Sequence, residues 1–216
     1  MPPLLLGSSS ARRRALIAAV GLSCEVARPD VDESPLPAEP PDAYVLRLSR
    51  AKAMALPPER LMPETYALTA DTTVALDGAI IGKPETPDEA RAMLRALRGR
   101  SHQVYTGVAL RDFATGEVQT ALVVTTVHMR DYTDEEIEAY IARGEPFDKA
   151  GGYGVQDMRF RPVQQIEGCL TNVIGLPLCA VSAMLRAKGV AVPQAPACSP
   201  QNLPCTIDAH IADASG

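Results

Sequence analysis

Apolar positions along this chain alternate between strand-like runs and helix-like stripes, at irregular intervals. Near the N-terminus, a short apolar run is followed directly by a segment with helical apolar spacing. Ser10 is suited to cap that helix and Gly21 to end it. The pattern predicts a strand over 3–7, a helix over 12–20, a strand over 22–27, a loop over 28–41 and a helix from Asp42 to about Leu56.

The rest of the chain combines alternating patterns with two helix-start signals. Asp77 and Gly78 predict a hairpin turn, and Thr86 and Thr133 each open a capping box. The predicted strands are 66–69 ending at Asp71, 72–76, 79–81, 104–113, 118–127 and two short ones near Phe160 and Ile166; the predicted helices are 86–98, 133–143 and 178–188. We therefore expect an α/β fold with a mixed sheet, in one domain over 1–192 followed by a flexible tail over 193–216.

Composition narrows the classes of protein. The chain has 216 residues, 46% of them hydrophobic, which is enough for one large domain or two small lobes. A net charge of -5 and the absence of Trp argue against a stable nucleic-acid complex. No apolar run approaches the ~18 residues of a membrane span, and 4–6 is too short for a signal peptide, so we expect a cytoplasmic protein with no membrane partner.

Cysteine and histidine usage gives no metal signature. The 5 Cys include no CxxC pair, and their odd number fits free thiols in a reducing compartment. A pairing of Cys198 with Cys205 remains a minor alternative. The 3 His are scattered and predict no zinc site.

Four polar segments carry the candidate chemistry. The densest is 148–156, which places Asp148, Lys149, three glycines and Gln156 together, and glycine lets a backbone approach a ligand closely. The others are 8–13, 70–72 and 82–84. A basic Ser-rich turn before a helix, an acid at a strand end and a Lys in a Gly-Pro turn together predict a phosphate-and-metal site.

Each candidate also has a plainer interpretation. Arg12 and Arg13 in the first helical turn could bind an anion together with the helix dipole and the hydroxyls of Ser8 and Ser10, or could be surface charges. Asp71 could be a turn former, and a lysine on a helix, here Lys52, is usually solvent-exposed.

The other candidate residues also have both a functional and a plainer interpretation. Asp71 and Glu33 together would suit Mg²⁺, which prefers oxygen ligands, although Glu33 alone in a polar loop is usually solvated. Lys83 is more suggestive, because its turn directs the ammonium group. His102 and Thr106 share one strand face by the period of two, and could be a cross-strand polar pair.

The order of these segments resembles the Maf family of nucleotide pyrophosphatases, also called septum-formation inhibitor proteins. The resemblance spans about residues 4–189. It rests on the segments 8–13, 32–33, 51–53, 70–72, 82–84, 99–108, 145–151, 153–156, 166–168 and 172–177.

The resemblance implies an elongated mixed sheet in two lobes with a central cleft, similar to inosine-triphosphate pyrophosphatases. It implies hydrolysis of a nucleoside triphosphate to a monophosphate and pyrophosphate with a divalent cation, Mg or Mn, and a possible homodimer. Asp71 would be the proton acceptor and, with Glu33, the metal ligand. The implied roles of the others are specificity for Arg12, Thr72 and Gln156; phosphate binding for Ser8, Ser10, Arg13, Lys52 and Lys83; and substrate binding for His102, Thr106, Asp148 and Lys149.

Within the family, Thr72 and Gln156 resemble the branch that acts on dTTP and UTP. A 7-methyl-GTP pyrophosphatase or an enzyme of broad modified-nucleotide activity is the alternative, because residues 157–162 depart from the usual small, Gly-rich continuation. Ala11 and Gly7 also replace the usual Pro and Ala. The alternative from another class is a non-catalytic, nucleotide-binding regulator of cell division, which could dispense with Asp71 and Glu33.

Overall fold

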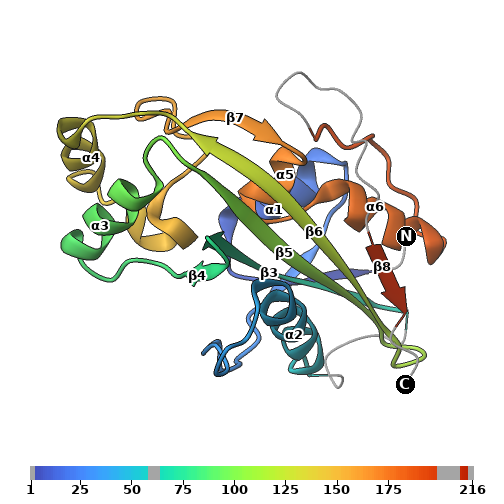
Figure 1. The fold of residues 1–216 in the computed structure, drawn as a ribbon. Coiled ribbons are helices and arrows are strands. Elements are labelled where there is room, and N and C mark those ends of the chain that lie inside the picture. Colours follow the sequence, from blue (N-terminus) through green and yellow to red (C-terminus); the bar gives the residue numbers. More distant parts are fainter. Residues whose placement is uncertain (1–2, 58–63, 199–209, 214–216) are drawn as a thin grey trace.

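A mixed, open sheet runs through the whole molecule (Figure 1). The computed structural model describes residues 3–57, 64–198 and, for the backbone alone, 210–213. Within these ranges the strands are β1 (Leu4–Gly7), β2 (Glu25–Ala27), β3 (Tyr66–Leu76), β4 (Ala79–Ile81), β5 (Ser101–Asp112), β6 (Val118–Met129), β7 (Val163–Glu167) and β8 (His210–Asp213). Their order is β2-β1-β3-β5-β6-β7, with β4 beside β3 and β8 beside β6. The pairs of β1 with β2 and β3 are parallel and the others antiparallel, which confirms the mixed α/β fold.

Helices cover both faces of the sheet (Figure 1). The α-helices of the described residues are α1 (Ala11–Ala19), α2 (Pro41–Met54), α3 (Pro87–Leu97), α4 (Asp134–Ile141), α5 (Leu170–Ile174) and α6 (Leu178–Ala187). Two short 3-10 turns, η2 (Pro146–Asp148) and η3 (Ala150–Gly152), form the glycine-rich segment. Ser10 caps α1 and Thr133 opens a complete capping box, as the sequence predicts.

Several local predictions are wrong in detail. β3 does not end at Asp71, which pairs with Gly107 in the middle of the strand. Asp42 is not the N-cap of α2, since Pro40 holds that position. Phe160 lies in a turn rather than a strand, because its backbone N–H donates to the Asp157 carboxylate.

Two hydrophobic cores lie on one face of the long strands, one toward each end. The first core contains Leu68 and Ala70 of β3 and packs under α1 and α6. The second contains Val74 and Leu76 and packs under α3 and α4. One threonine interrupts the buried run of each long strand between the cores, and we call these three the threonine belt: Thr72, Thr106 and Thr125. The belt marks the boundary between two lobes.

Helix α2 covers the opposite face, and one glycine allows its close approach. A Cβ on Gly107 would lie 2.4 Å from the carbonyl oxygen of Val45 in α2. The hydroxyl of Thr69 in β3 donates to the Ser49 carbonyl of α2 at 2.6 Å. Because Asp71 lies directly opposite Gly107, α2 passes closely over the carboxylate.

Part of the segment after residue 192 is described and makes contacts. Gln194 donates to the Val20 carbonyl, Cys198 is buried in the first core, and β8 pairs with β6. The prediction of a flexible tail did not anticipate these contacts, and the domain boundary itself stays a prediction. In the portion of the chain that the structure describes, none of the helices has the length and apolar character that crossing a membrane requires.

Candidate active site

A gap at the edge of the sheet opens the candidate site. β1 pairs with residues 66–68 of β3, and β4 pairs with residues 74–76 of the same strand. The edge between them carries Asp71 and Thr72, which point to opposite faces because side chains alternate along a strand. Both residues nevertheless line one cleft of about 1170 Å³. The cleft therefore wraps around the exposed edge of β3, and this explains how consecutive residues serve the same site.

Lys52 joins two carboxylates on the α2 side of this edge. Its Nζ lies 2.6 Å from Oδ1 of Asp71 and 2.7 Å from Oε1 of Glu33. Lys52 and Asp71 are buried, whereas the Glu33 side chain is 54% exposed. Lys52 is thus not a solvent-exposed helix lysine, and its implied role in phosphate binding stays a prediction.

The two carboxylates have opposite pKa shifts. Burial raises the pKa of Asp71 above its ordinary value, and the neighbouring charges of Lys52 and Arg13 offset this only in part. Burial also acts on Glu33, but the hydrogen bond and charge of Lys52 with the charges of Lys83 and Arg13 outweigh it and lower the pKa. A carboxylate with a raised pKa is suited to accept a proton, and one with a lowered pKa to hold a cation.

Arg13 and the threonine belt form a hydrogen-bonded chain on the other side of the edge. Arg13 donates through Nε to the Gly175 carbonyl at 2.8 Å and through Nη2 to Thr72 Oγ1 at 3.1 Å. A third bond reaches Ser8 Oγ at 3.3 Å. Burial lowers the pKa of Arg13. These bonds hold the guanidinium in one position at the cleft wall.

Asn172 extends this chain into the core. Thr72 Oγ1 lies 2.9 Å from Thr106 Oγ1, which donates to the Asn172 carbonyl at 3.3 Å. The Asn172 amide donates to Thr125 Oγ1 at 2.9 Å. Asn172, Thr125 and Gly175 were not predicted as site residues. Segment 172–177 was noted as a family motif, and that motif was the available signal.

The second lobe contributes the opposite wall of the cleft. Arg12 of α1 forms an ion pair with Asp148 of η2, and Lys149 bonds to Asp148 and to the Glu145 carbonyl. Burial raises the pKa of Asp148, but the hydrogen bonds of Lys149 and Arg12 outweigh it, so the pKa is lowered. Gln156 lines the cleft and is exposed.

Lys83 is positioned by the glycine-rich segment. Gly151 has a φ of 71°, which favours glycine, and its N–H donates to the Gly82 carbonyl at 2.9 Å. Lys83 follows and lines the same cleft.

Most predicted site residues therefore meet in one cleft. The predicted site residues among its lining are Ser8, Ser10, Arg12, Arg13, Glu33, Lys52, Asp71, Thr72, Lys83, Asp148, Lys149 and Gln156. The other two lie outside the cleft lining. Thr106 is buried behind Thr72, and His102 is buried against Tyr153, with Nε2 2.7 Å from its hydroxyl and a pKa lowered by burial to about 4. Direct substrate contact by these two side chains stays a prediction, although both are buried and neither is among the residues that line the cleft.

Two carboxylates are the candidate ligands for a divalent cation. In the described part of the chain, no group of three or more His, Cys, Asp and Glu side chains forms a complete metal site. Glu33 and Asp71 nevertheless converge on one ammonium nitrogen. Two carboxylates with substrate phosphate and water are a suitable ligand set for Mg²⁺. The donor set thus fits a cation that is bound together with a phosphorylated ligand.

Comparison with known proteins identifies the family. The family model described as Maf-like protein matches residues 3–188. The chain belongs to the Maf family.

Bacterial relatives within the Maf family are similar over nearly their whole length. The dTTP/UTP pyrophosphatase of Anaeromyxobacter dehalogenans strain 2CP-C is 45% identical over 194 residues, which cover 89% of this chain and 97% of the relative. The protein of the same name from Chromobacterium violaceum is 46% identical over 193 residues, covering 88% and 96%. That from Nitrosomonas europaea is 43% identical over 200 residues, covering 88% and 96%.

Proposed function

We propose that this Maf-family chain is a nucleoside triphosphate pyrophosphatase. It hydrolyses the anhydride bond between the α- and β-phosphates and releases a nucleoside monophosphate and pyrophosphate. The observation that carries the proposal is the buried Asp71 carboxylate, held 2.6 Å from Lys52 at the edge of a cleft lined by basic side chains. The names of the relatives support the same reaction.

Asp71 acts as the general base. It accepts a proton from a water molecule whose oxygen attacks the α-phosphorus, and pyrophosphate leaves with the bonding electrons. The raised pKa of Asp71 favours this role. Lys52, Lys83 and Arg13 offset the negative charge of the phosphate chain, and the hydroxyls of Ser8 and Ser10 donate hydrogen bonds to it. Positioning and electrostatics supply most of the acceleration.

Glu33 and Asp71 are the residues that would hold Mg²⁺ or Mn²⁺. When bound, such a cation would supply charge neutralisation on the phosphates and a lower pKa for coordinated water. Lys52, whose ammonium group contacts both carboxylates in this structure, would then turn toward the phosphates.

The substrate we propose is dTTP or UTP. The support is the name of the relatives and the presence of Thr72 and Gln156 in the cleft. Thr72 and Gln156 offer polar atoms for the base edge and sugar, while Arg12, Asp148 and Lys149 close the cleft from the second lobe. The ligand does not reach His102, and Thr106 contributes only by holding Thr72.

A triphosphate panel tests both levels of the proposal. Pyrophosphate release would be measured with dTTP, UTP, 7-methyl-GTP, dCTP and ATP, each with Mg²⁺, with Mn²⁺ and with a chelator. We expect dTTP and UTP to be cleaved fastest, and only with a cation. Faster cleavage of 7-methyl-GTP would overturn the substrate, and no pyrophosphate from any triphosphate would overturn the reaction and favour the non-catalytic regulator.

A further inference from the structure

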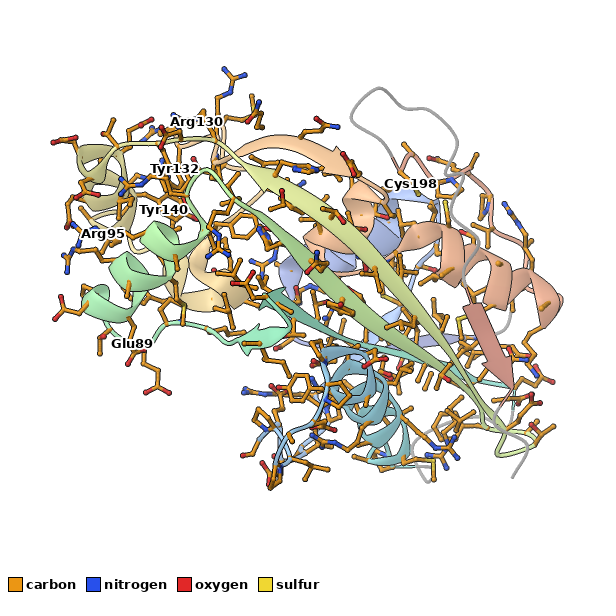
Figure 2. The ribbon with its side chains drawn as sticks, in the orientation of Figure 1. Glu89, Arg95, Arg130, Tyr132, Tyr140 and Cys198 are labelled. Carbon is orange, nitrogen blue, oxygen red and sulfur yellow. The ribbon has the colours of Figure 1, made fainter. Side chains whose placement is uncertain are left out.

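Three cysteine side chains meet behind the cleft, where the chain after α6 returns to α5. Cys198 Sγ lies 2.8 Å from Cys179 Sγ. Cys169 Sγ lies 3.1 Å from Thr171 Oγ1, which is 3.8 Å from Cys198 Sγ. Figure 2 shows Cys198 beside the helices that Figure 1 labels α5 and α6. None of the three cysteines is among the residues that line the cleft.

Each of the two cysteines lies at a defined backbone position. The carbonyl of Cys198 accepts a hydrogen bond from the Leu170 N–H, at the start of α5, at 2.8 Å. Cys179 lies in the first turn of α6, two residues after Pro177. A disulfide has a sulfur–sulfur length of about 2.05 Å, so the two sulfurs need to approach by less than about 1 Å. The two sulfurs therefore lie within a short side-chain movement of bonding distance.

We propose that Cys179 and Cys198 are a redox modification site, which a peroxide converts to a disulfide that ties the segment after α6 to the start of that helix. The site differs from the pairing of Cys198 with Cys205 considered from the sequence, and Cys205 lies outside the described residues.

The reaction balances with one hydrogen peroxide per disulfide. Cys179 is half-buried and is the more exposed of the two cysteines, so its sulfur attacks a peroxide oxygen. The O–O bond breaks, one water leaves and Cys179 becomes a sulfenic acid. The buried Cys198 sulfur then attacks the Cys179 sulfur and releases the second water. Two electrons pass from the thiols to the peroxide, and a dithiol reductant reverses the step.

The environment of Cys198 disfavours it as the thiol that reacts first with a peroxide. A hydrogen bond with Cys169 lowers the pKa of Cys198, but the bond with Cys179 and burial together raise it, to about 12. A buried thiol with a raised pKa is the poorer nucleophile, so oxidation begins at the more exposed Cys179.

The disulfide would stabilise the fold rather than change the cleft. It would close the loop from Cys179 to Cys198, which includes most of α6 and the segment on the first core. Closing a loop of this length removes freedom from the unfolded chain. We expect a melting temperature about 5–10 °C higher in the oxidised protein.

The test uses the full chain, treated with hydrogen peroxide and then alkylated. Trypsin would release Cys169 and Cys179 in one peptide, residues 160–186, and Cys198 and Cys205 in another, residues 189–216. The digest shows a link between these peptides, and serine variants assign it. We expect the linked peptides in the wild type and in Cys169→Ser and Cys205→Ser, their loss in Cys179→Ser and Cys198→Ser, and reversal by dithiothreitol.

Cys24→Ser is the matched control, because Cys24 is also a half-buried thiol packed against the first core. This variant should keep the link and the rise in melting temperature. A link that persists in Cys179→Ser, or one lost in Cys169→Ser, would overturn the assignment. So would full alkylation of Cys179 and Cys198 after peroxide. These readouts do not involve triphosphate hydrolysis, so they stand or fall apart from the proposed function.

Discussion

At the scale of single residues, the most informative contact is the shared ammonium group of Lys52. A buried carboxylate is costly unless it is paired, and Asp71 is paired with a lysine that it shares with Glu33. Its pKa is nevertheless raised, so burial outweighs the ion pair. An ionised carboxylate with a raised pKa lowers the stability of the fold, and such groups are typical of functional sites.

Asp71→Asn separates the role of the base from its role in the fold. The amide keeps the shape of the side chain but accepts no proton, so we expect kcat/KM for dTTP to fall about 10²–10⁴-fold. Because the folded pKa is raised, the Asp71 carboxyl contributes stability only at low pH, and this is lost as the pH rises through the folded pKa. In urea unfolding at pH 7, the variant should therefore have a free energy of unfolding that equals that of the wild type or exceeds it by up to about 1 kcal/mol. Near wild-type turnover would contradict the assignment of the base.

The pH dependence of the reaction follows from the same shift. Asp71 must be ionised to accept a proton, so kcat/KM should fall as the pH drops through its folded pKa, at a pH above the range of an ordinary aspartate. The decrease in kcat/KM should fit the uptake of a single proton. His102 does not produce it, because its pKa is lowered to about 4 and its ring is buried outside the cleft. A His102→Asn variant with an unchanged acid limb would check this, and a shifted limb would implicate the histidine.

At the scale of elements, the site depends on how closely α2 lies on the sheet. A methyl group on Gly107 would meet backbone of α2 at 2.4 Å, and backbone cannot move aside as a flexible side chain can. Gly107→Ala should therefore lower the free energy of unfolding by about 1–3 kcal/mol and reduce activity, because α2 also carries Lys52. Gly82→Ala is the control, since a Cβ there has nothing within 4 Å. Urea unfolding of both variants would check this, and equal stability would mean that α2 is not held by this contact.

Local sequence patterns predicted some element boundaries correctly and missed others. Ser10 and Thr133 mark helix starts correctly, because capping is a local property. The continuation of β3 through Asp71 was missed, because an aspartate in a strand resembles a strand end until its partner Gly107 is known. Helix α5 is only five residues long, too short for a periodic signal, so only the family motif pointed to Asn172, and its hydrogen bond to Thr125 of the threonine belt depends on the tertiary fold.

At the scale of the whole molecule, the fold is two cores that share one sheet, with the cleft at their boundary. The resemblance to a family predicted which segments meet, and twelve of the fourteen predicted site residues do line one cleft. The sequence could not predict that the cleft wraps around a gap between β1 and β4, because that gap depends on strand register. The second lobe has a hydrophobic core of its own, which contains Tyr132 and Tyr140 (both labelled in Figure 2), and each of these rings packs against Phe160.

The pair of Arg12 and Asp148 connects the two lobes across the cleft. Arg12 comes from α1 in the first lobe and Asp148 from η2 in the second. The Arg12 side chain is 36% exposed and the Asp148 side chain 60% exposed, and ion pairs open to solvent contribute at most about 1 kcal/mol to stability. Its effect should therefore appear in binding, through the position of the second lobe over the substrate. We expect Arg12→Gln and Asp148→Asn each to lower kcat/KM about 3–10-fold, mainly through KM, with little change in unfolding.

A double-mutant cycle distinguishes a clamp from two separate substrate contacts. If the pair acts as one clamp, the double variant should lose little more activity than either single variant, because the second substitution removes nothing further. Independent contacts would instead multiply the two losses. A third arrangement gives the opposite sign, because an Asp148 that only withholds Arg12 from the phosphates would make Asp148→Asn faster than the wild type. Additive losses or a faster variant would each contradict the clamp, and a clamp of exposed charges should also weaken as salt is raised from 0.05 to 0.5 M, since its ions are screened.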